Sequence, residues 1–400
     1  MLFPIQNLPS RFKTFLKKQS LFKKWRSTVQ TNVFPSQKQR TKRALLYYKA
    51  DVFQKKELLT DFRHTNNSEI YQMAKILDQS GFEVDVVDRS AEWEDIQKLK
   101  SKRYDLFLSN AAGNSARYHQ KFLNEFNLGK RIVFAAGPEP IRSNELVNAQ
   151  HENFKKRSGV DCVVRRLVTG DHFAERFQGI DAIFYVGNDF SKSTYEKFGI
   201  PLFPIHPSSS PRLKIEENEF DKKSPKHFIY VGGTGLICKG LDLVLETFDG
   251  LSNLSLDICG PADEKDFWDY YAPLMKRNPQ IRFHGFVDVN GPLFHEITSR
   301  AAFYLFPSSA EGCATSVTTC MRRGVIPIIN FEVGVDTEDF GYLIADRTIP
   351  ALRKLVKDLS ETPKEEIIRR TKKTFAASER YTQAGFTKSF TEALRSALAL

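Results

Sequence analysis

The sequence predicts an α/β protein built from two doubly wound domains that face each other across a cleft. Short apolar runs alternate with helix-like segments along most of the chain, which is typical of βαβ units. These runs lack polar alternation, so both faces of each strand are expected to be buried, as in a mostly parallel sheet. The alternation is interrupted by a proline- and serine-rich stretch between Pro201 and Pro225. We therefore expect domains at residues 44–205 and 227–375, with a linker at 206–226.

The first domain is expected to begin with a short strand at Ala44–Tyr48. A helix over Glu69–Gly81 is predicted because Ile70, Met73 and Leu77 share one helical face. The remaining elements follow from the same change of pattern between apolar runs and helix-like segments. Strands are predicted at Val84–Val87, Tyr104–Leu108, Ile132–Ala136 and Ala182–Val186, and helices at Trp93–Leu99, Ser115–Leu128 and Glu145–Arg157.

The second domain repeats this alternation and ends in helices. Its strands are predicted at Phe228–Val231, Leu254–Cys259, Ile281–Phe283, Phe303–Phe306 and Val325–Ile329. Its helices are predicted at Leu241–Phe248, Phe267–Arg277, Leu293–Arg300 and Cys313–Arg323. Two helices are expected to close the chain, Ile349–Leu359 and Lys364–Leu398, the latter bent near Tyr381 to Gly385.

Composition excludes several classes of protein. The 400 residues are 41% hydrophobic and 27% charged, as in a globular protein. The five cysteines are scattered without a CxxC pair, which predicts reduced thiols and neither a disulfide framework nor a zinc site. The eight histidines show no metal-binding spacing. No apolar stretch approaches the roughly 20 residues that span a bilayer.

The net charge of +11 comes from the first 43 residues, which contain eleven Lys or Arg and no Asp or Glu. The rest of the chain is neutral, so the basic composition does not indicate a nucleic-acid-binding body. Apolar residues share one side of a helical wheel, with lysines opposite, and this predicts an amphipathic helix on an anionic membrane surface. The alternatives are a disordered tail, an organelle transit peptide or a helix docked on the protein itself. We expect a cytoplasmic protein, peripheral at the inner face of the membrane. The apolar side comprises Leu8, Phe12, Phe15, Leu16 and Phe22.

The segment from Phe303 to Asp339 predicts an anion site. A strand ends at Pro307, a polar loop carries Glu311, and a helix follows from near Gly312. In a βαβ unit this loop opens onto the ligand crevice, and the helix aims backbone N–H groups and a partial positive charge at it. A phosphate is the expected ligand, with Glu311 positioned to accept hydrogen bonds from sugar hydroxyls. The alternative is an ordinary loop with a surface glutamate.

A second loop, GGTGLICKGLD, brings a lysine to the same edge of the domain. The dinucleotide fingerprint fails because its third glycine falls at Cys238, and the Walker pattern fails because Lys239 precedes Gly240. A diphosphate could be held by Lys239 from one side and by the helix near Gly312 from the other. One such charge-assisted hydrogen bond contributes roughly 1.5–3 kcal/mol. The alternative for Lys239 is a solvated lysine in a turn.

With these residues in view, the chain resembles the family 4 glycosyltransferases of the GT-B fold from Ala44 onward. The similarity is strongest in KGLDLVLETF, LDICGP, IRFHGFVDV and PSSAEGCATSVTTCM. It implies transfer of a sugar from a nucleotide-sugar donor to a hydroxyl acceptor, with retained anomeric configuration, no metal and no other cofactor. It also implies that the terminal helices cross back, with residues 376–400 packing on the first domain. Saccharide or lipid-linked acceptors are the expected partners, in glycan synthesis, and nucleic acid is not.

By matched position, Lys239 resembles the diphosphate lysine, and Glu311 the first acid of the E-x7-E motif, placed at the reacting groups. The loop HGFV is expected to border the nucleobase. Across the cleft, His64 is expected to orient or deprotonate the acceptor, the alternative being a surface or helix-capping histidine. The other expected donor contacts are Gly233, Thr234, Gly235, Gly260, His284, Gly285, Phe286, Ser308, Gly312, Cys313, Ala314, Thr315 and Thr319, and the acceptor-side candidates are Asn66, Asn67, Glu69, Arg142 and Asn188.

Two positions depart from the family pattern. The second acid of E-x7-E falls at Thr319, and the basic residue that often precedes the lysine by five positions falls at Thr234. These departures leave two alternatives to a transferase: a binding or scaffold protein with a degenerate site, and a sugar-nucleotide epimerase on the same fold.

Overall fold

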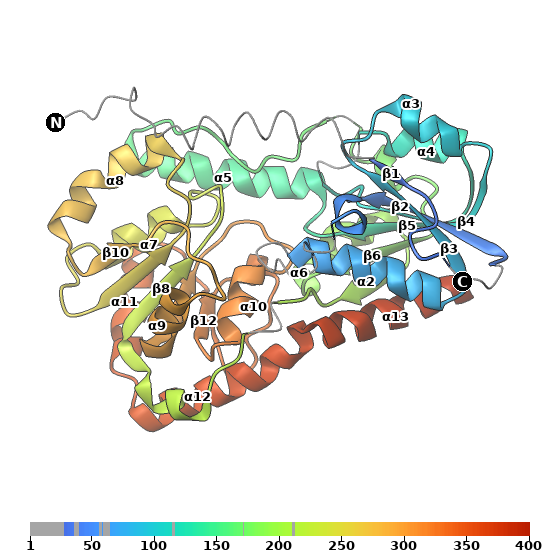
Figure 1. The fold of residues 1–400 in the computed structure, drawn as a ribbon. Coiled ribbons are helices and arrows are strands. Elements are labelled where there is room, and N and C mark those ends of the chain that lie inside the picture. Colours follow the sequence, from blue (N-terminus) through green and yellow to red (C-terminus); the bar gives the residue numbers. More distant parts are fainter. Residues whose placement is uncertain are drawn as a thin grey trace, which may run out of the picture.

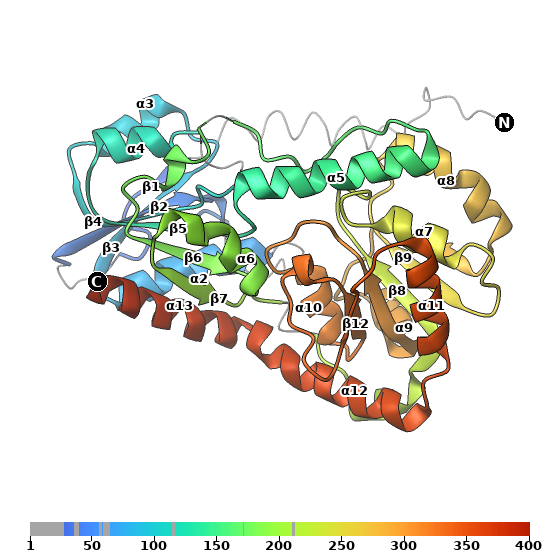
Figure 2. The same ribbon diagram turned by 180° about the vertical axis from the view of Figure 1, so that it is seen from behind.

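The computed structural model describes residues 28–400 except 36–39, 56–57, 59–64, 114–116, 171 and 210–212. The apolar and basic residues of the predicted amphipathic helix, and the candidate base His64, lie outside the described residues. Within the range predicted as a tail, Val29–Gln30 forms a strand and Lys42 begins another. Figures 1 and 2 show two sheets at opposite ends of the molecule, each flanked by helices, as the sequence predicts.

The first sheet has seven strands in the order β1-β3-β2-β4-β5-β6-β7. Every pairing is parallel except that of the short β1, which runs antiparallel to β3. The strands are β1 Val29–Gln30, β2 Lys42–Tyr48, β3 Phe82–Asp88, β4 Arg103–Ser109, β5 Asn127–Ala135, β6 Ala182–Val186 and β7 Leu202–Ile205. Its helices are α2 Thr65–Gln79, α3 Trp93–Ile96, α4 His119–Glu125, α5 Pro140–Ser158 and α6 Asp189–Tyr195.

The second sheet has six parallel strands in the order β10-β9-β8-β11-β12-β13. The strands are β8 Ser224–Val231, β9 Ser255–Cys259, β10 Ile281–Phe283, β11 Ala301–Phe306, β12 Ile326–Ile329 and β13 Tyr342–Leu343. The helices are α7 Leu241–Phe248, α8 Lys265–Arg277, α9 Pro292–Arg300, α10 Thr315–Met321, α11 Ile349–Ser360, α12 Lys364–Ala377 and α13 Gln383–Ala399. The strands β11 and β12 and residues Phe228–Tyr230 of β8 are buried on both faces, as their continuous apolar sequences predict.

Several element boundaries differ from the predictions. The helix predicted over Ser115–Leu128 is confined to α4, because β5 begins five residues earlier than expected, at Asn127. The strand β7 was missed, since Pro204 lies within it, and proline is tolerated there because β7 is an edge strand. The helix predicted to begin at Glu145 begins at Pro140, where the Glu139 side chain accepts a hydrogen bond from the Arg142 N–H.

The C-terminal helices cross back to the first domain, as expected. The bend predicted near Tyr381 is a short 3₁₀ turn between α12 and α13, and the Thr382 side chain caps α13 by accepting from the Gly385 N–H. Figures 1 and 2 show α13 running from the second sheet to the first, with α5 on the other side of the molecule. The 3₁₀ turn is anchored to the segment between the domains, because the Ser209 N–H and hydroxyl both donate to the Tyr381 carbonyl, each at 2.7 Å.

The carboxyl of Glu69 fixes the connection between the domains. It lies at the start of α2, is 4% exposed, and accepts a 2.8 Å hydrogen bond from the Ser208 N–H. Burial raises the pKa of this carboxyl to about 7, although the hydrogen bonds from Ser208 oppose the rise. The Glu69 side chain thus holds the backbone that leads into the second domain, and its expected acceptor-side role stays a prediction.

We expect Glu69→Gln to stabilise the protein increasingly as the pH rises from about 4.5 to about 7. Between these pH values the folded protein keeps a proton on Glu69 that the unfolded chain releases, so the free energy of unfolding of the wild type falls as the pH rises. Glutamine does not titrate, so the variant does not undergo this loss. Urea unfolding of both proteins between pH 4.5 and 8 measures the difference. The exposed Glu94, replaced in the same way, is the control, and an equal slope for both variants would contradict the prediction.

Candidate active site between the two domains

A cavity of about 380 Å³ lies where the carboxyl ends of the two parallel sheets meet. In the first sheet, chain order reverses direction between β2 and β4, and Tyr48 and Asn110 at the ends of these strands line the cavity. In the second sheet the reversal lies between β8 and β11, and the loop after β11 contributes Glu311 and Gly312. Ligands of doubly wound sheets bind at such switch points, so the cavity is the expected place for a substrate.

Glu311 reaches the cavity from the loop after β11. Its side chain is 10% exposed, and its Oε1 atom accepts hydrogen bonds from Lys239 Nζ at 2.5 Å and from Ser308 Oγ at 3.2 Å. Burial opposes ionisation of this carboxyl, but the charges of Lys239 and Arg166 outweigh burial and lower the Glu311 pKa. The carboxylate is therefore held ionised between two cations.

Lys239 meets Glu311 because two loops pack tightly against each other. Gly240 adopts φ +71°, and a Cβ there would lie 2.5 Å from the Pro307 carbonyl oxygen. This close approach lets the Ser309 N–H donate to the Cys238 carbonyl at 2.8 Å. Burial lowers the pKa of the Lys239 ammonium, and the nearby Arg166 charge lowers it further, while Glu311 raises it. The juxtaposition predicted for Lys239 and the segment after β11 is thus present.

Arg166 is a site residue that the sequence did not reveal. It follows α5 in the first domain, and its Nη2 atom lies 3.4 Å from Glu311 Oε2. Its backbone has φ +70°, which is uncommon for a residue other than glycine. The surrounding sequence CVVRRL matches neither a helix nor a strand pattern, so only the contact between the domains shows where Arg166 lies.

The glycine turn after β8 makes contacts that were not expected. The Gly235 and Leu236 N–H groups donate to the buried carboxylate of Glu264, at 2.5 and 3.2 Å. A buried carboxylate thus already accepts from the Gly235 N–H, and the expected donor contact of Gly235 stays a prediction. Gly235 also serves to admit Arg166, since a Cβ there would lie 2.5 Å from Arg166 Cδ. Gly233 and Thr234 are exposed in the same turn.

The helix α10 is shorter than predicted, with seven residues from Thr315 to Met321. Its N-cap residue is Ala314, which provides no capping side chain, and the Ala314 N–H donates to the Val333 carbonyl. Cys313 is buried, and Gly312 packs against the backbone of the first domain near Ala136. The loop before α10 is therefore both cavity wall and domain interface. Thr319, at the position of the missing second acid, is 7% exposed on α10.

Residues 225–362 match the family model of the Glycosyl transferases group 1. The second domain is a group 1 glycosyl transferase domain. Over 98 residues the chain is 29% identical to glycogen synthase 1 from Geobacter metallireducens, an alignment that covers 24% of this chain and 20% of that protein's length.

Two solved structures extend the likeness to nearly the whole chain. Sucrose-phosphate synthase from Thermosynechococcus elongatus superposes with a TM-score of 0.64 at 13% identity, covering 90% of this chain and 100% of that one. Anabaena HepE, in complex with UDP and glucose, gives a TM-score of 0.56 at 13% identity, covering 89% and 99%. At these identities the likeness shows the fold alone. It confirms the predicted GT-B architecture, with two Rossmann-like domains across a cleft.

Within the group 1 domain, the HGFV loop lies beside the end of β9. The Gly260 N–H donates to the Gly285 carbonyl at 2.9 Å, which joins two expected donor contacts. His284 Nε2 lies 2.7 Å from Asp257 Oδ1, so the imidazole is engaged by the sheet. Phe286 is 74% exposed, which leaves its ring available to a flat ligand.

The acceptor-side candidates do not converge on one point. Asn66 lines the cavity, whereas the Asn67 side chain accepts from Lys49 Nζ at 2.5 Å. Asn188 caps α6 and donates to the Phe331 carbonyl at 3.1 Å, so it bridges the domains. Arg142 pairs with Glu145 on the exposed face of α5. Other contacts of the fold thus engage Asn67, Asn188 and Arg142, and their acceptor roles stay predictions.

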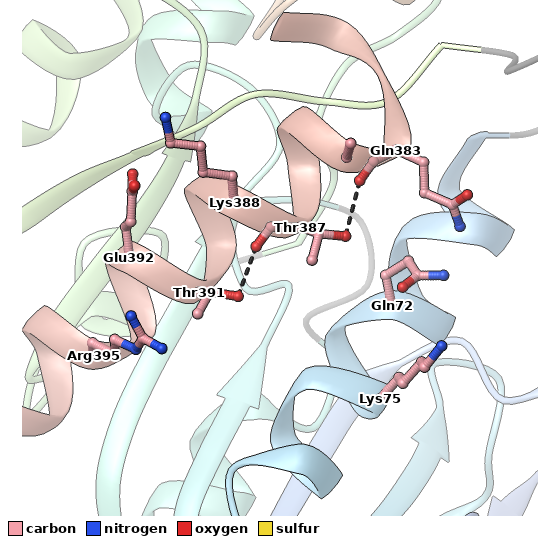
Figure 3. A pocket seen from close by; sticks show the side chains of 9 residues that line it. Gln72, Lys75, Gln383, Thr387, Lys388, Thr391, Glu392 and Arg395 are labelled. Carbon is pink, nitrogen blue, oxygen red and sulfur yellow. Dashed lines mark hydrogen bonds between the residues drawn. The ribbon is translucent and has the colours of Figure 1, made fainter.

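A larger hollow of about 690 Å³ lies elsewhere, between α2 and α13. Figure 3 shows Gln72 and Lys75 of α2 facing a row of α13 side chains, in which Thr387 and Thr391 donate to carbonyls of their own helix. It is an open polar groove outside the cleft, and neither Glu311 nor Lys239 lines it. We therefore place the active site in the smaller cavity, where the charged groups converge.

Replacing Gly240 by alanine is expected to destabilise the group 1 domain more than the same change at Gly250. Both residues have positive φ, so alanine costs about 1–2 kcal/mol in backbone strain at either position. At Gly240 the new Cβ also meets the Pro307 carbonyl, which adds about 1–3 kcal/mol, whereas nothing lies within 4 Å at Gly250. Urea unfolding of the two variants measures this difference, and equal losses would show that the loop contact is not tight.

Proposed function

We propose that this chain transfers a sugar from a nucleoside-diphosphate sugar to a hydroxyl group of a saccharide or lipid-linked acceptor. One observation carries the proposal: Lys239 pairs at 2.5 Å with Glu311, and Glu311 lines a cavity between the switch points of two doubly wound sheets. The match to a glycosyl transferase family supports the reaction class. The UDP and glucose in the HepE complex support the class of donor.

The charges of the site suit the bond that this reaction breaks. Cleavage between the anomeric carbon and the diphosphate builds negative charge on the leaving oxygen and positive charge on the sugar. The Lys239 ammonium is placed to stabilise the first. The Glu311 carboxylate is placed to stabilise the second. The leaving diphosphate takes the bonding electron pair, and the acceptor oxygen forms the new bond while its proton passes to the departing diphosphate oxygen.

Glu311 and the donor diphosphate share one cation, the Lys239 ammonium. Without substrate, Lys239 donates to Glu311. A bound diphosphate competes for the same ammonium, and repulsion between phosphate and carboxylate moves Glu311 toward the sugar. We propose that transfer proceeds with retention of the anomeric configuration. We also propose that it needs no metal, because the protein's own cations stabilise the negative charge of the leaving diphosphate. His64 is proposed to orient the acceptor hydroxyl.

A nucleotide-sugar-binding scaffold is the second candidate. The buried Thr319 at the place of the second acid favours it, since a hydroxyl makes a weaker and less directional contact with a ribose than a carboxylate does. A sugar-nucleotide epimerase would use the same cavity and release a changed donor without an acceptor. Product analysis with and without an acceptor separates the transferase, the scaffold and the epimerase.

With membranes present as a source of acceptor, we expect release of nucleoside diphosphate from one member of a panel of nucleotide sugars, and a loss of about 10²–10³-fold in turnover on Lys239→Ala. Loss of one partner leaves the other charge buried, so folding of the variant is checked by thermal unfolding. Lys226→Ala, at an exposed position of β8, is the control. EDTA is expected to leave turnover unchanged. Full activity of Lys239→Ala, or no turnover with any donor, would refute the proposal.

Among the described residues, no helix is long and apolar enough to cross a membrane. We propose, on its sequence, that the basic segment within residues 1–43 binds anionic lipid. Residues 1–27 contain seven Lys or Arg, each contributing about 1 kcal/mol near such a surface. Deleting residues 1–27 is expected to reduce sedimentation with phosphatidylserine vesicles, and added salt to do the same for the full chain. Unchanged sedimentation would refute the membrane role.

A further inference from the structure

Arg166 is the one charged side chain from the first domain that forms an ion pair with Glu311 among the described residues. The two cations approach the two oxygens of a single carboxylate, Lys239 at 2.5 Å from Oε1 and Arg166 at 3.4 Å from Oε2. Their charged groups are therefore within reach of one small anion. A diphosphate has several negative oxygens on two phosphorus centres, so it can offer both cations more than one oxygen. The carboxylate offers each cation a single oxygen.

The guanidinium is accessible to a ligand although its stem is packed. The Arg166 side chain is 39% exposed and lines the cavity, whereas the side chains of Lys239 and Glu311 are about 10% exposed. Its aliphatic stem lies over Gly235, where a Cβ would lie 2.5 Å away. Arginine presents a planar fork of donors that matches phosphate oxygens in pairs, which an ammonium cannot do.

The segment that carries Arg166 is anchored to both domains. The Val163 N–H donates to Asp266 Oδ2 at 2.8 Å, and Arg165 pairs with Glu264 at 3.4 Å, both in the second domain. On the other side, the Asn144 side chain exchanges two hydrogen bonds with the Val168 backbone, at 2.8 and 2.9 Å. These contacts hold Arg166 at φ +70°, a conformation that costs energy for a residue with a Cβ. Strain of this kind persists where the surroundings fix it, and it is concentrated at functional sites.

We propose that Arg166 binds the diphosphate of the donor and supplies, from the first domain, a second cation beside Lys239. This inference rests on the proposed function. Donor binding then joins the two domains, because the phosphates are held by Lys239 of one and Arg166 of the other. Thr234 is exposed on the turn that packs against Arg166, at a position where the family often has a basic residue. Arg166 supplies the missing positive charge from the first domain.

Calorimetric binding of UDP, GDP and ADP, and of the corresponding nucleosides, to the full chain tests this role. For the diphosphate that binds the wild type, Arg166→Met is expected to weaken affinity by about 10- to 100-fold, the loss for one charge-assisted phosphate contact. Binding of the matching nucleoside should change less than twofold, and Arg166→Lys should restore part of the diphosphate affinity.

Arg157→Met is the matched control. Arg157 also joins the domains, through Asp242 at 2.6 Å and Glu246 at 3.1 Å, but it does not line the cavity. Unchanged diphosphate affinity in this control supports the proposal, whereas an equal loss in both variants shows that Arg166 is only a tether and overturns it. Equal diphosphate affinity of Arg166→Met and wild type also overturns it, leaving the proposed function intact. If no nucleoside diphosphate binds the wild type, both proposals fail.

Discussion

The structure of the cleft depends on one buried carboxylate and the two cations that keep it ionised. An ionised carboxylate in a largely dry site costs several kcal/mol unless it is paired and hydrogen-bonded. Glu311 meets this requirement with Lys239, Arg166 and Ser308. Each partner comes from a different segment, so the carboxylate fixes the loop after β8, the loop after β11 and the segment after α5 relative to one another. The cavity is the space left beside this cluster.

This arrangement links electrostatics to domain geometry. Lys239 and Glu311 lie in loops that follow β8 and β11, which are neighbours in one sheet. These loops therefore meet regardless of how the domains are oriented. Arg166 belongs to the other domain, so its ion pair with Glu311 joins the two domains. The Ser191 hydroxyl, which donates to the Gly312 carbonyl at 3.3 Å, is a second contact between them. A ligand that takes over these cations therefore acts on the position of both domains.

The fold and part of the site follow from the sequence for an identifiable reason. Lys239 and Glu311 could be placed together because each follows an apolar run that reads as a parallel strand, and the loops of such strands emerge at one edge. Arg166 could not be placed, since its position depends on how the two domains pack. Glu264 could not be placed either, since its role depends on which backbone N–H groups its buried carboxylate accepts from. The contact of the Gly235 N–H with Glu264 could not be foreseen for the same reason. The limits of α4 and α10 were overestimated because helix-like residues continue past the points where sheet pairing and the domain interface take over.

The most direct measurement is a crystal structure of the protein with the nucleoside diphosphate that it binds. The account predicts the diphosphate in the cavity between the domains, with Lys239 Nζ about 3 Å from a phosphate oxygen and Glu311 separated from that ammonium. A diphosphate bound outside this cavity, or one held in it while Lys239 remains paired with Glu311, would contradict the account.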